Sequence, residues 1–128
     1  PEAGKPTRRK VGRRMRIERA DLGPVTVLRL AGDLDERGVD ALRTAMYECL
    51  TQGRFKVVLG LRDVGFISYL GVGVMVERLR KLRDLGGDVK LVSINLYTER
   101  LFRMAGVTSL FETYDSESQA IGVFQEAA

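Results

Sequence analysis

The periodicity of apolar and polar positions changes several times along the chain, and each periodicity predicts one kind of element. Short runs that alternate, or that are continuously apolar, are typical of strands. The first two runs flank an Asp-Leu-Gly-Pro turn at 21–24, which predicts an antiparallel hairpin. The expected strands are Met15–Ala20, Val25–Ala31, Lys56–Leu61, Val89–Ser93 and Leu110–Tyr114.

Apolar residues spaced three and four apart predict amphipathic helices between and after these strands. The first two helices are expected at Glu36–Thr51 and Val72–Leu85. The third begins after Asn95, a good N-cap, and the fourth after a capping box at 116–119. The residues expected to face inward on the third helix are Leu101, Met104 and Ala105.

Strands that alternate with helices imply parallel pairing with right-handed crossovers. The length of 128 residues fits one domain. We therefore expect an α/β fold with a mostly parallel sheet of about five strands, an antiparallel N-terminal edge strand and about four helices.

Basic residues are concentrated near the N-terminus. Residues 1–19 hold eight Lys or Arg against two Glu, so the rest of the chain is net negative although the whole carries +4. We expect 1–14 to be a basic disordered arm and 15–128 to be the folded domain. The arm could contact nucleic acid, acidic lipid or an acidic partner through charge. A solvated terminus is the favoured interpretation, and no specific nucleic-acid binding is expected.

The chain has no histidine and one cysteine, Cys49. The lack of histidine excludes Ser-His and Cys-His nucleophiles and histidine metal sites. Cys49 lies on the apolar face of the first helix, so we expect a buried thiol, and a single thiol fits a reducing cytoplasm.

No apolar run approaches the roughly 20 residues of a membrane helix, and no secretory signal is expected. With no catalytic constellation, we expect a cytoplasmic protein that is not an enzyme and uses no cofactor.

The most informative segment is LRDVGFISYLGVG, from Leu61 to Gly73. A buried strand leads into a turn that carries Ser68 to the start of a helix, where Gly71 and Gly73 let the backbone come close. A helix start has unpaired N–H groups and the positive end of the helix dipole, so it suits a phosphate or a partner's carboxylate. The two glycines lack the rest of a nucleotide-binding fingerprint. Close packing of helix against strand is therefore the favoured explanation for both.

Three acidic residues, Asp33, Asp35 and Glu36, precede or begin the first helix. Carboxylates this close together could bind a hard metal ion. Without a further oxygen-rich cluster, helix capping is favoured, with Asp35 as the N-cap and Glu36 as a first-turn acid. No metal site is expected.

Four apolar residues surround the turn before the second helix: Val64, Phe66, Tyr69 and Leu70. They cannot all be buried, and apolar groups beside helix N–H donors make a docking patch. Alternatively, Phe66 and Leu70 belong to the core and Tyr69 is half-covered. The sequence supports the two interpretations equally.

From about Met15 to Phe124 the chain resembles the STAS domain and, within it, the bacterial anti-sigma factor antagonists. The matching stretches are LRLAGDLD at 28–35, VVLGLRDVGFISYLGVGVMV at 57–76, LRDLGGDVKLVSIN at 82–95 and RLFRMAGVTSLFETYDSESQAI at 100–121. The resemblance implies a protein that binds an anti-sigma factor with serine kinase activity and so regulates sigma-factor-dependent transcription. In the family, the kinase phosphorylates a serine in the turn, which blocks binding, and a phosphatase resets the switch.

The family turn reads approximately Phe-Met/Ile-Asp-Ser-Ser-Gly-Leu-Gly. Positions that match are Phe66, Ile67, Gly71, Gly73 and the GDLD loop at 32–35. Ser68 stands at the family's aspartate, Tyr69 at its phosphorylated serine and Leu70 at its second serine. The resemblance therefore implies an altered or absent serine switch, with Ser68 as the remaining candidate for phosphorylation. The expected partner-binding residues are Asp33, Asp35, Phe66, Ser68, Tyr69, Leu70 and Gly71.

Three functions stay open. The first is a sigma-pathway module that binds an anti-sigma kinase through this loop. The second is a STAS scaffold or accessory domain in a signalling or lipid-transport complex, without phosphorylation. The third, and much the weakest, is a nucleotide-binding domain. A phosphatase partner and a homodimer are open in the same way.

Overall fold

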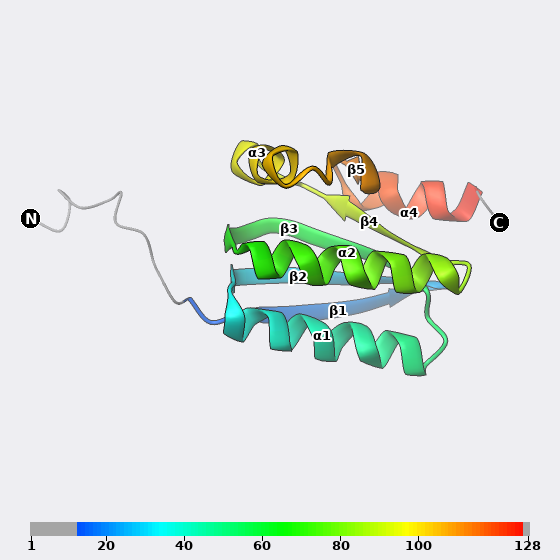
Figure 1. Cartoon of the computed structure of the whole chain (residues 1–128). Helices are drawn as coiled ribbons and strands as arrows, with labels where there is room; N and C mark the ends of the chain where they lie inside the picture. Colours follow the sequence, from blue (N-terminus) through cyan, green and yellow to red (C-terminus); the bar gives the residue numbers. More distant parts are fainter. Residues whose placement is uncertain (1–12, 127–128) are drawn as a thin grey trace, which may run out of the picture.

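A five-stranded sheet with helices on both faces forms the centre of the protein (Figure 1). The computed structural model describes residues 13–126. The strands lie in the order β1-β2-β3-β4-β5; β1 is antiparallel to β2 and the other pairs are parallel, which confirms the expected α/β fold. The strands are β1 (Arg16–Leu22), β2 (Val25–Leu34), β3 (Lys56–Ile67), β4 (Asp88–Val92) and β5 (Glu112–Tyr114).

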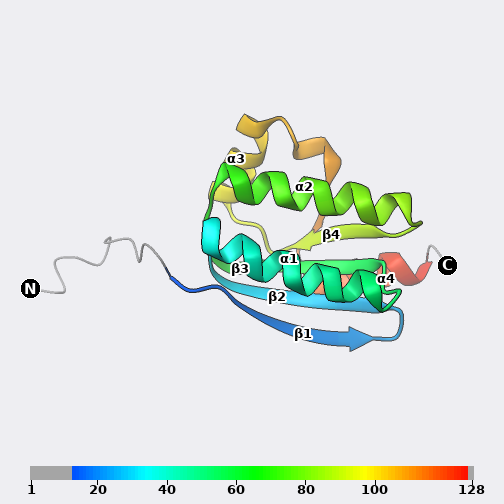
Figure 2. The same ribbon diagram turned by 60° about the horizontal axis from the view of Figure 1, so that its bottom comes forward.

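Four α-helices connect or follow these strands. They are α1 (Glu36–Thr51), α2 (Tyr69–Asp84), α3 (Leu96–Ala105) and α4 (Glu117–Glu126). α1, α2 and α3 contribute apolar side chains to the larger core, whereas α4 packs on the opposite face (Figure 2). Cys49 is buried in the larger core, as its place on the apolar stripe of α1 predicts, and burial raises the pKa of its thiol.

The smaller core lies beneath α4 and includes a buried lysine. Ala120 and Phe124 of α4 pack against valines of β2, β3 and β4. Lys90 in β4 is only 5% exposed; its Nζ lies 4.6 Å from the ring centroid of Phe124 and donates hydrogen bonds to Asp88 and Glu112. The ring and the two carboxylates compensate the desolvation of the ammonium group, so α4 is positioned by one specific contact as well as by apolar burial.

Strand β3 is six residues longer than the sequence predicts, because two β-bulges interrupt its alternation. Its register with β2 shifts between Arg29 and Ala31 and again between Gly32 and Asp33. Each shift adds one residue to β3 relative to β2. The positions of β3 that face the larger core are therefore Val57, Leu59, Leu61, Val64 and Ile67. This spacing, first two and then three residues, does not predict a single strand.

Other element boundaries differ locally. Met104 was expected to face inward on α3 but is 75% exposed, and Phe102 is buried instead, next to Phe111. A 3-10 helix, Thr108–Leu110, replaces the start of the last expected strand. In the capping box of α4, Ser116 accepts from the Gln119 N–H, but the Gln119 side chain binds the N–H of Asp115.

The basic arm expected at 1–14 lies almost wholly outside the described residues. Its last two members are described, and the backbone of Arg13 pairs with Asp33: the N–H of Asp33 donates to the Arg13 carbonyl at 3.1 Å. The described chain therefore contacts the domain two residues before the expected boundary at 15.

Candidate functional site

Two strand-to-helix turns lie side by side at one end of the sheet. β2 and β3 are neighbours, and their last residues pair as Asp33 with Phe66 and Leu34 with Ile67. α1 and α2 therefore begin next to each other (Figure 2). The topology thus brings the two predicted loops, around Asp35 and Ser68, to one edge.

Ser68 is the N-cap of α2 and links the two turns. Its Oγ accepts a hydrogen bond from the Gly71 N–H at 3.1 Å, and its hydroxyl donates to the Leu34 carbonyl at 3.2 Å. The Ser68 N–H donates to the same carbonyl at 3.0 Å. This capping explains why α2 begins at Tyr69, three residues before the expected start.

The residues after the cap differ sharply in exposure. Tyr69 is 63% exposed and Leu70 is 45% exposed, whereas Val64 is buried and Phe66 is half-buried. The interpretation that places Leu70 in the core is therefore wrong, and Val64 is buried and does not belong to a docking patch. Tyr69 and Leu70 are both available to a partner.

The two glycines of α2 have different roles. A Cβ on Gly71 would lie 2.8 Å from the Leu34 carbonyl oxygen and 3.1 Å from the Ile67 side chain, so the helix start packs against the strands only with glycine there. A Cβ on Gly73 would meet nothing within 4 Å. Close packing thus explains Gly71, as expected, and the same explanation is wrong for Gly73.

Tyr97 of α3 extends the exposed apolar surface and was not singled out from the sequence. Its hydroxyl donates to the carbonyl of Ile67 at 3.3 Å, and the residue is 43% exposed. Asn95 caps α3 through the N–H of Thr98, which places Tyr97 in the first turn of the helix that follows β4. An aromatic residue just after an N-cap, in the connection after the neighbouring strand, is the signal that could have found it.

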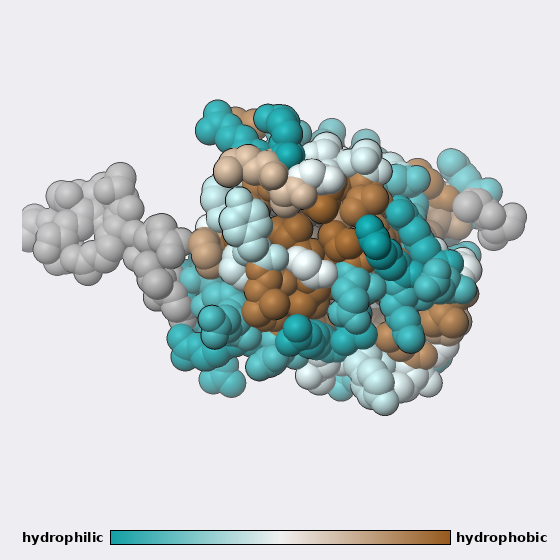
Figure 3. All heavy atoms as spheres, in the orientation of Figure 1, coloured by the Kyte–Doolittle hydropathy of each residue, from teal (hydrophilic) through white to brown (hydrophobic). Residues whose placement is uncertain are grey.

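We call Tyr69, Leu70 and Tyr97 the turn surface. Figure 3 shows hydrophobic surface over the first half of α2, bordered by hydrophilic side chains. An apolar centre with a polar rim is the usual arrangement of a protein–protein interface. Tyrosine is also among the residues that contribute most to binding at such interfaces.

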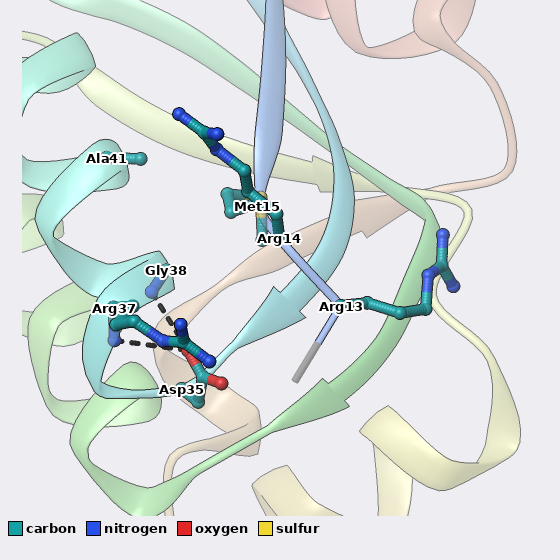
Figure 4. Close-up of a pocket in the computed structure, with 7 residues that line it drawn as sticks. All are labelled: Arg13, Arg14, Met15, Asp35, Arg37, Gly38 and Ala41. Atoms are coloured by element: carbon teal, nitrogen blue, oxygen red, sulfur yellow. Dashed lines mark hydrogen bonds between the residues drawn. The ribbon is translucent and has the colours of Figure 1, made fainter. Parts of the chain in front are cut away.

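The acidic residues of the first turn are used within the chain. Asp33 is only 3% exposed, and its Oδ2 accepts from the Arg13 N–H at 3.2 Å. Asp35 caps α1 by accepting from the N–H groups of Arg37 and Gly38, as predicted (Figure 4). Asp35 also lines a hollow of about 410 Å³. Across residues 13–126 the structure groups no three His, Cys, Asp or Glu side chains that could hold a metal ion.

No helix within the described range has the length and apolarity needed to span a membrane. The turn surface can offer a partner apolar contacts and two tyrosine hydroxyl groups, next to the hydrogen-bonded start of a helix.

Comparison with known proteins shows which protein family has this arrangement of elements. The family model described as the STAS domain matches residues 16–120. An anti-sigma F factor antagonist from Paenibacillus polymyxa is 29% identical over 108 residues, covering 84% of this chain and 92% of the relative.

Solved structures agree with this result. A candidate anti-sigma factor antagonist from Thermotoga maritima superposes with a TM-score of 0.77 at 25% identity, covering 83% of this chain and 92% of its own. The antagonist SpoIIAA in its unphosphorylated form has a TM-score of 0.69 at 22% identity, covering 87% and 97%, and shows the same fold. SpoIIAA, from Bacillus, has also been solved in a phosphorylated form.

Proposed function

Because the chain belongs to the STAS domain family, with anti-sigma factor antagonists among its relatives, we propose that it binds an anti-sigma factor through the turn surface and without a serine switch. Capture of the anti-sigma factor would release a sigma factor for transcription. The proposal concerns a binding protein, because the turn offers contacts and no group placed for catalysis.

The observation that carries the proposal is the contrast between Ser68 and the two residues after it. The Ser68 hydroxyl donates one hydrogen bond and accepts another inside the protein, and both hold the start of α2. Tyr69 and Leu70 expose apolar side chains in the same turn. The turn thus combines a fixed backbone with an accessible surface, which lowers the entropy lost on binding.

The sequence of the turn supports binding that ATP does not reverse. Tyr69 occupies the position of the family's phosphorylated serine, and its hydroxyl lies across a ring from the backbone. A kinase site shaped for serine would not place this oxygen in line with the γ-phosphate of ATP, since phosphoryl transfer depends on positioning. Phosphorylation of Ser68 would remove the hydroxyl proton and with it the hydrogen bond to the Leu34 carbonyl, one of the contacts that join the two turns.

Mixing the protein with the purified anti-sigma factors of the same genome tests the proposal. Isothermal titration calorimetry is expected to detect a complex with at least one of them, and preincubation with Mg-ATP is expected to leave the affinity unchanged. Mass spectrometry of the ATP-treated protein is expected to find no phosphate in the turn. A phosphate on Ser68 together with loss of the complex would show that the switch works at the cap residue.

A double variant gives a matched comparison. Ser68→Asp with Tyr69→Ser restores the Asp-Ser pair of the family, and aspartate is also a good N-cap. A kinase-type anti-sigma factor that binds the natural protein should phosphorylate this variant and release it. Ser68→Asp alone keeps the cap and supplies no serine, so it should bind and stay bound.

The scaffold alternative makes the opposite prediction for the first experiment. If none of the anti-sigma factors binds, the turn surface serves a different partner, such as a protein of a signalling or lipid-transport assembly. Nucleotide titration separates the third function, because a nucleotide-binding domain should bind ATP or GTP without any partner.

A further inference from the structure

α4 covers only part of its face of the sheet. The apolar residues beneath it are Val25, Val27, Val58 and Val92. Further along the same strands, Arg29 pairs with Gly60, and β1 adds Arg16 opposite Ala31. Beyond α4 this face of the sheet is therefore polar and carries several arginine side chains.

Three adjoining hollows of about 390, 440 and 410 Å³ cross the uncovered part, and all three are lined by Arg62 and Asp63. We call them together the arginine trough. Its arginines are Arg13, Arg16, Arg29 and Arg62, and its small residues are Ala31, Gly60 and Gly65. Arg13 also lines the hollow beside α1, but Figure 4 shows its side chain pointing away from Asp35 and Ala41.

The arginines of the trough differ in how far they are already paired. Arg29 binds Glu117 at 2.7 Å and Glu18 at 3.1 Å, and the hydrogen bond from Arg29 holds the pKa of Glu117 below its usual range. Arg62 has an 81% exposed side chain, and its Nε lies 3.5 Å from Oδ1 of Asp63. Within residues 13–126, Arg16 is exposed and its side chain forms no hydrogen bond or ion pair. The guanidinium groups of Arg16 and Arg62 are therefore more available to a ligand than that of Arg29.

We propose that the arginine trough binds an acidic peptide segment of a partner protein. Arginine presents a planar fork that matches a carboxylate with two hydrogen bonds. The small residues leave room for an extended main chain to approach the sheet. The trough is separate from the turn surface, since Tyr69 and Leu70 belong to the helix layer on the opposite face of the sheet.

The lining of the trough favours a peptide over a nucleic acid. Proteins that bind single-stranded nucleic acid stack its bases on aromatic side chains. No aromatic residue lines the trough in the described part of the chain. The trough also contains the carboxylates of Glu18, Asp63, Asp115 and Glu117, which would repel a continuous run of phosphates. A peptide with spaced acidic residues can avoid these positions.

Fluorescence anisotropy with the full chain tests the proposal. The probe is a fluorescein-labelled decapeptide of alternating glutamate and serine, with a lysine–serine decapeptide as the reversed-charge control. Saturable binding of the acidic probe is expected, weakening as salt is raised. Arg16→Glu and Arg62→Glu should each lower the affinity roughly tenfold, because each replaces an attraction by a repulsion.

Arg100→Glu is the matched control, because Arg100 is an exposed arginine of α3 that does not line the trough. It should change the affinity less than about twofold, as expected for a distant screened charge. Equal effects of all three variants, or no saturable binding of the acidic probe, would overturn the proposal. Stronger binding of a ten-nucleotide oligothymidylate, lost in Arg16→Glu and Arg62→Glu, would assign the trough to nucleic acid instead. Circular dichroism melts of the three variants should match the parent, because all three substituted side chains are exposed.

Discussion

The two turns at the end of the sheet share one construction and differ in what they present. In the first, Asp35-Glu36-Arg37-Gly38 begins α1; in the second, Ser68-Tyr69-Leu70-Gly71 begins α2. Each starts with a polar N-cap and ends three residues later with a buried glycine. The cap accepts the glycine N–H in both cases.

The glycines also do the same work. A Cβ on Gly38 would collide with the carbonyl oxygen of Asp33, as a Cβ on Gly71 would with that of Leu34. Both helices therefore begin directly against a strand end. The two residues between cap and glycine point outward, and only there do the turns diverge: a charged pair in the first and an apolar pair in the second. Cap and glycine determine the geometry, and the middle pair is left to determine function.

The largest expected effect is on folding. Gly38→Ala and Gly71→Ala should each lower the free energy of unfolding by about 1–3 kcal/mol, since the added methyl group meets backbone that cannot rotate away. Gly38→Ala should be the more damaging, because its Cβ position is the more crowded. Urea denaturation measures both. A Gly71→Ala protein as stable as the parent would show that the second turn is not tightly packed.

The next largest effect concerns partner binding and distinguishes the two residues between cap and glycine in one turn from those in the other. Tyr69→Ala with Leu70→Ala should weaken the complex with the anti-sigma factor by about 2 kcal/mol, roughly thirtyfold, as for apolar anchors at interfaces. Glu36→Ala with Arg37→Ala, the equivalent pair of the first turn, should leave it nearly unchanged. Calorimetric titration of the two double variants gives the comparison, and equal losses would mean that the partner covers both turns.

The two N-caps should contribute about equally to the stability of the protein. Asp35→Ala and Ser68→Ala each remove the acceptor for helix N–H groups and should cost about 1 kcal/mol of stability. Ser68→Asp should keep most of it. If Ser68→Ala costs much more than Asp35→Ala in thermal or urea unfolding, the bond from Ser68 to Leu34 is the stronger of its two contacts.

The smallest effect has the opposite sign. Gly73→Ala should stabilise the protein by about 0.5–1 kcal/mol, because the site is open and alanine favours the helix over glycine. It is the same chemical change as Gly71→Ala, two residues further along α2. Destabilisation at both positions in urea unfolding would contradict the assignment of crowding to Gly71 alone.

The sequence predicts the fold well wherever periodicity is regular. α1 has the expected bounds, Glu36–Thr51, and the antiparallel edge strand and the parallel pairing of the other strands are as expected from the alternating elements. The second half of β3 is missed because the bulges break the alternation on which the prediction depends. Met104 is misplaced because the inward face of α3 runs through Thr98, Leu101 and Phe102 instead.

The site is predicted less completely than the fold. Ser68 and Asp35 are recognisable from the sequence because a cap is a local interaction of a polar side chain with the next turn. Gly71 and Gly73 look alike in the sequence, since crowding comes from Leu34, which is distant along the chain. Tyr97 is missed for the same reason: its contact with Ile67 depends on how α3 lies against the end of β3.

The two bulges of β3 also determine which changes this protein can accept. Each extra residue reverses the face on which the following side chains lie, and the second reversal undoes the first. Removing or inserting a single residue between Gly60 and Phe66 would turn Ile67 outward and carry Ser68 away from the Leu34 carbonyl. The number of residues between Gly60 and Phe66 can therefore change only in pairs if Ile67 is to stay buried. The identities of residues 69 and 70 are not constrained in this way. New partner specificity can arise at the turn by substitution, whereas a single-residue change in length would alter the side on which the turn residues lie.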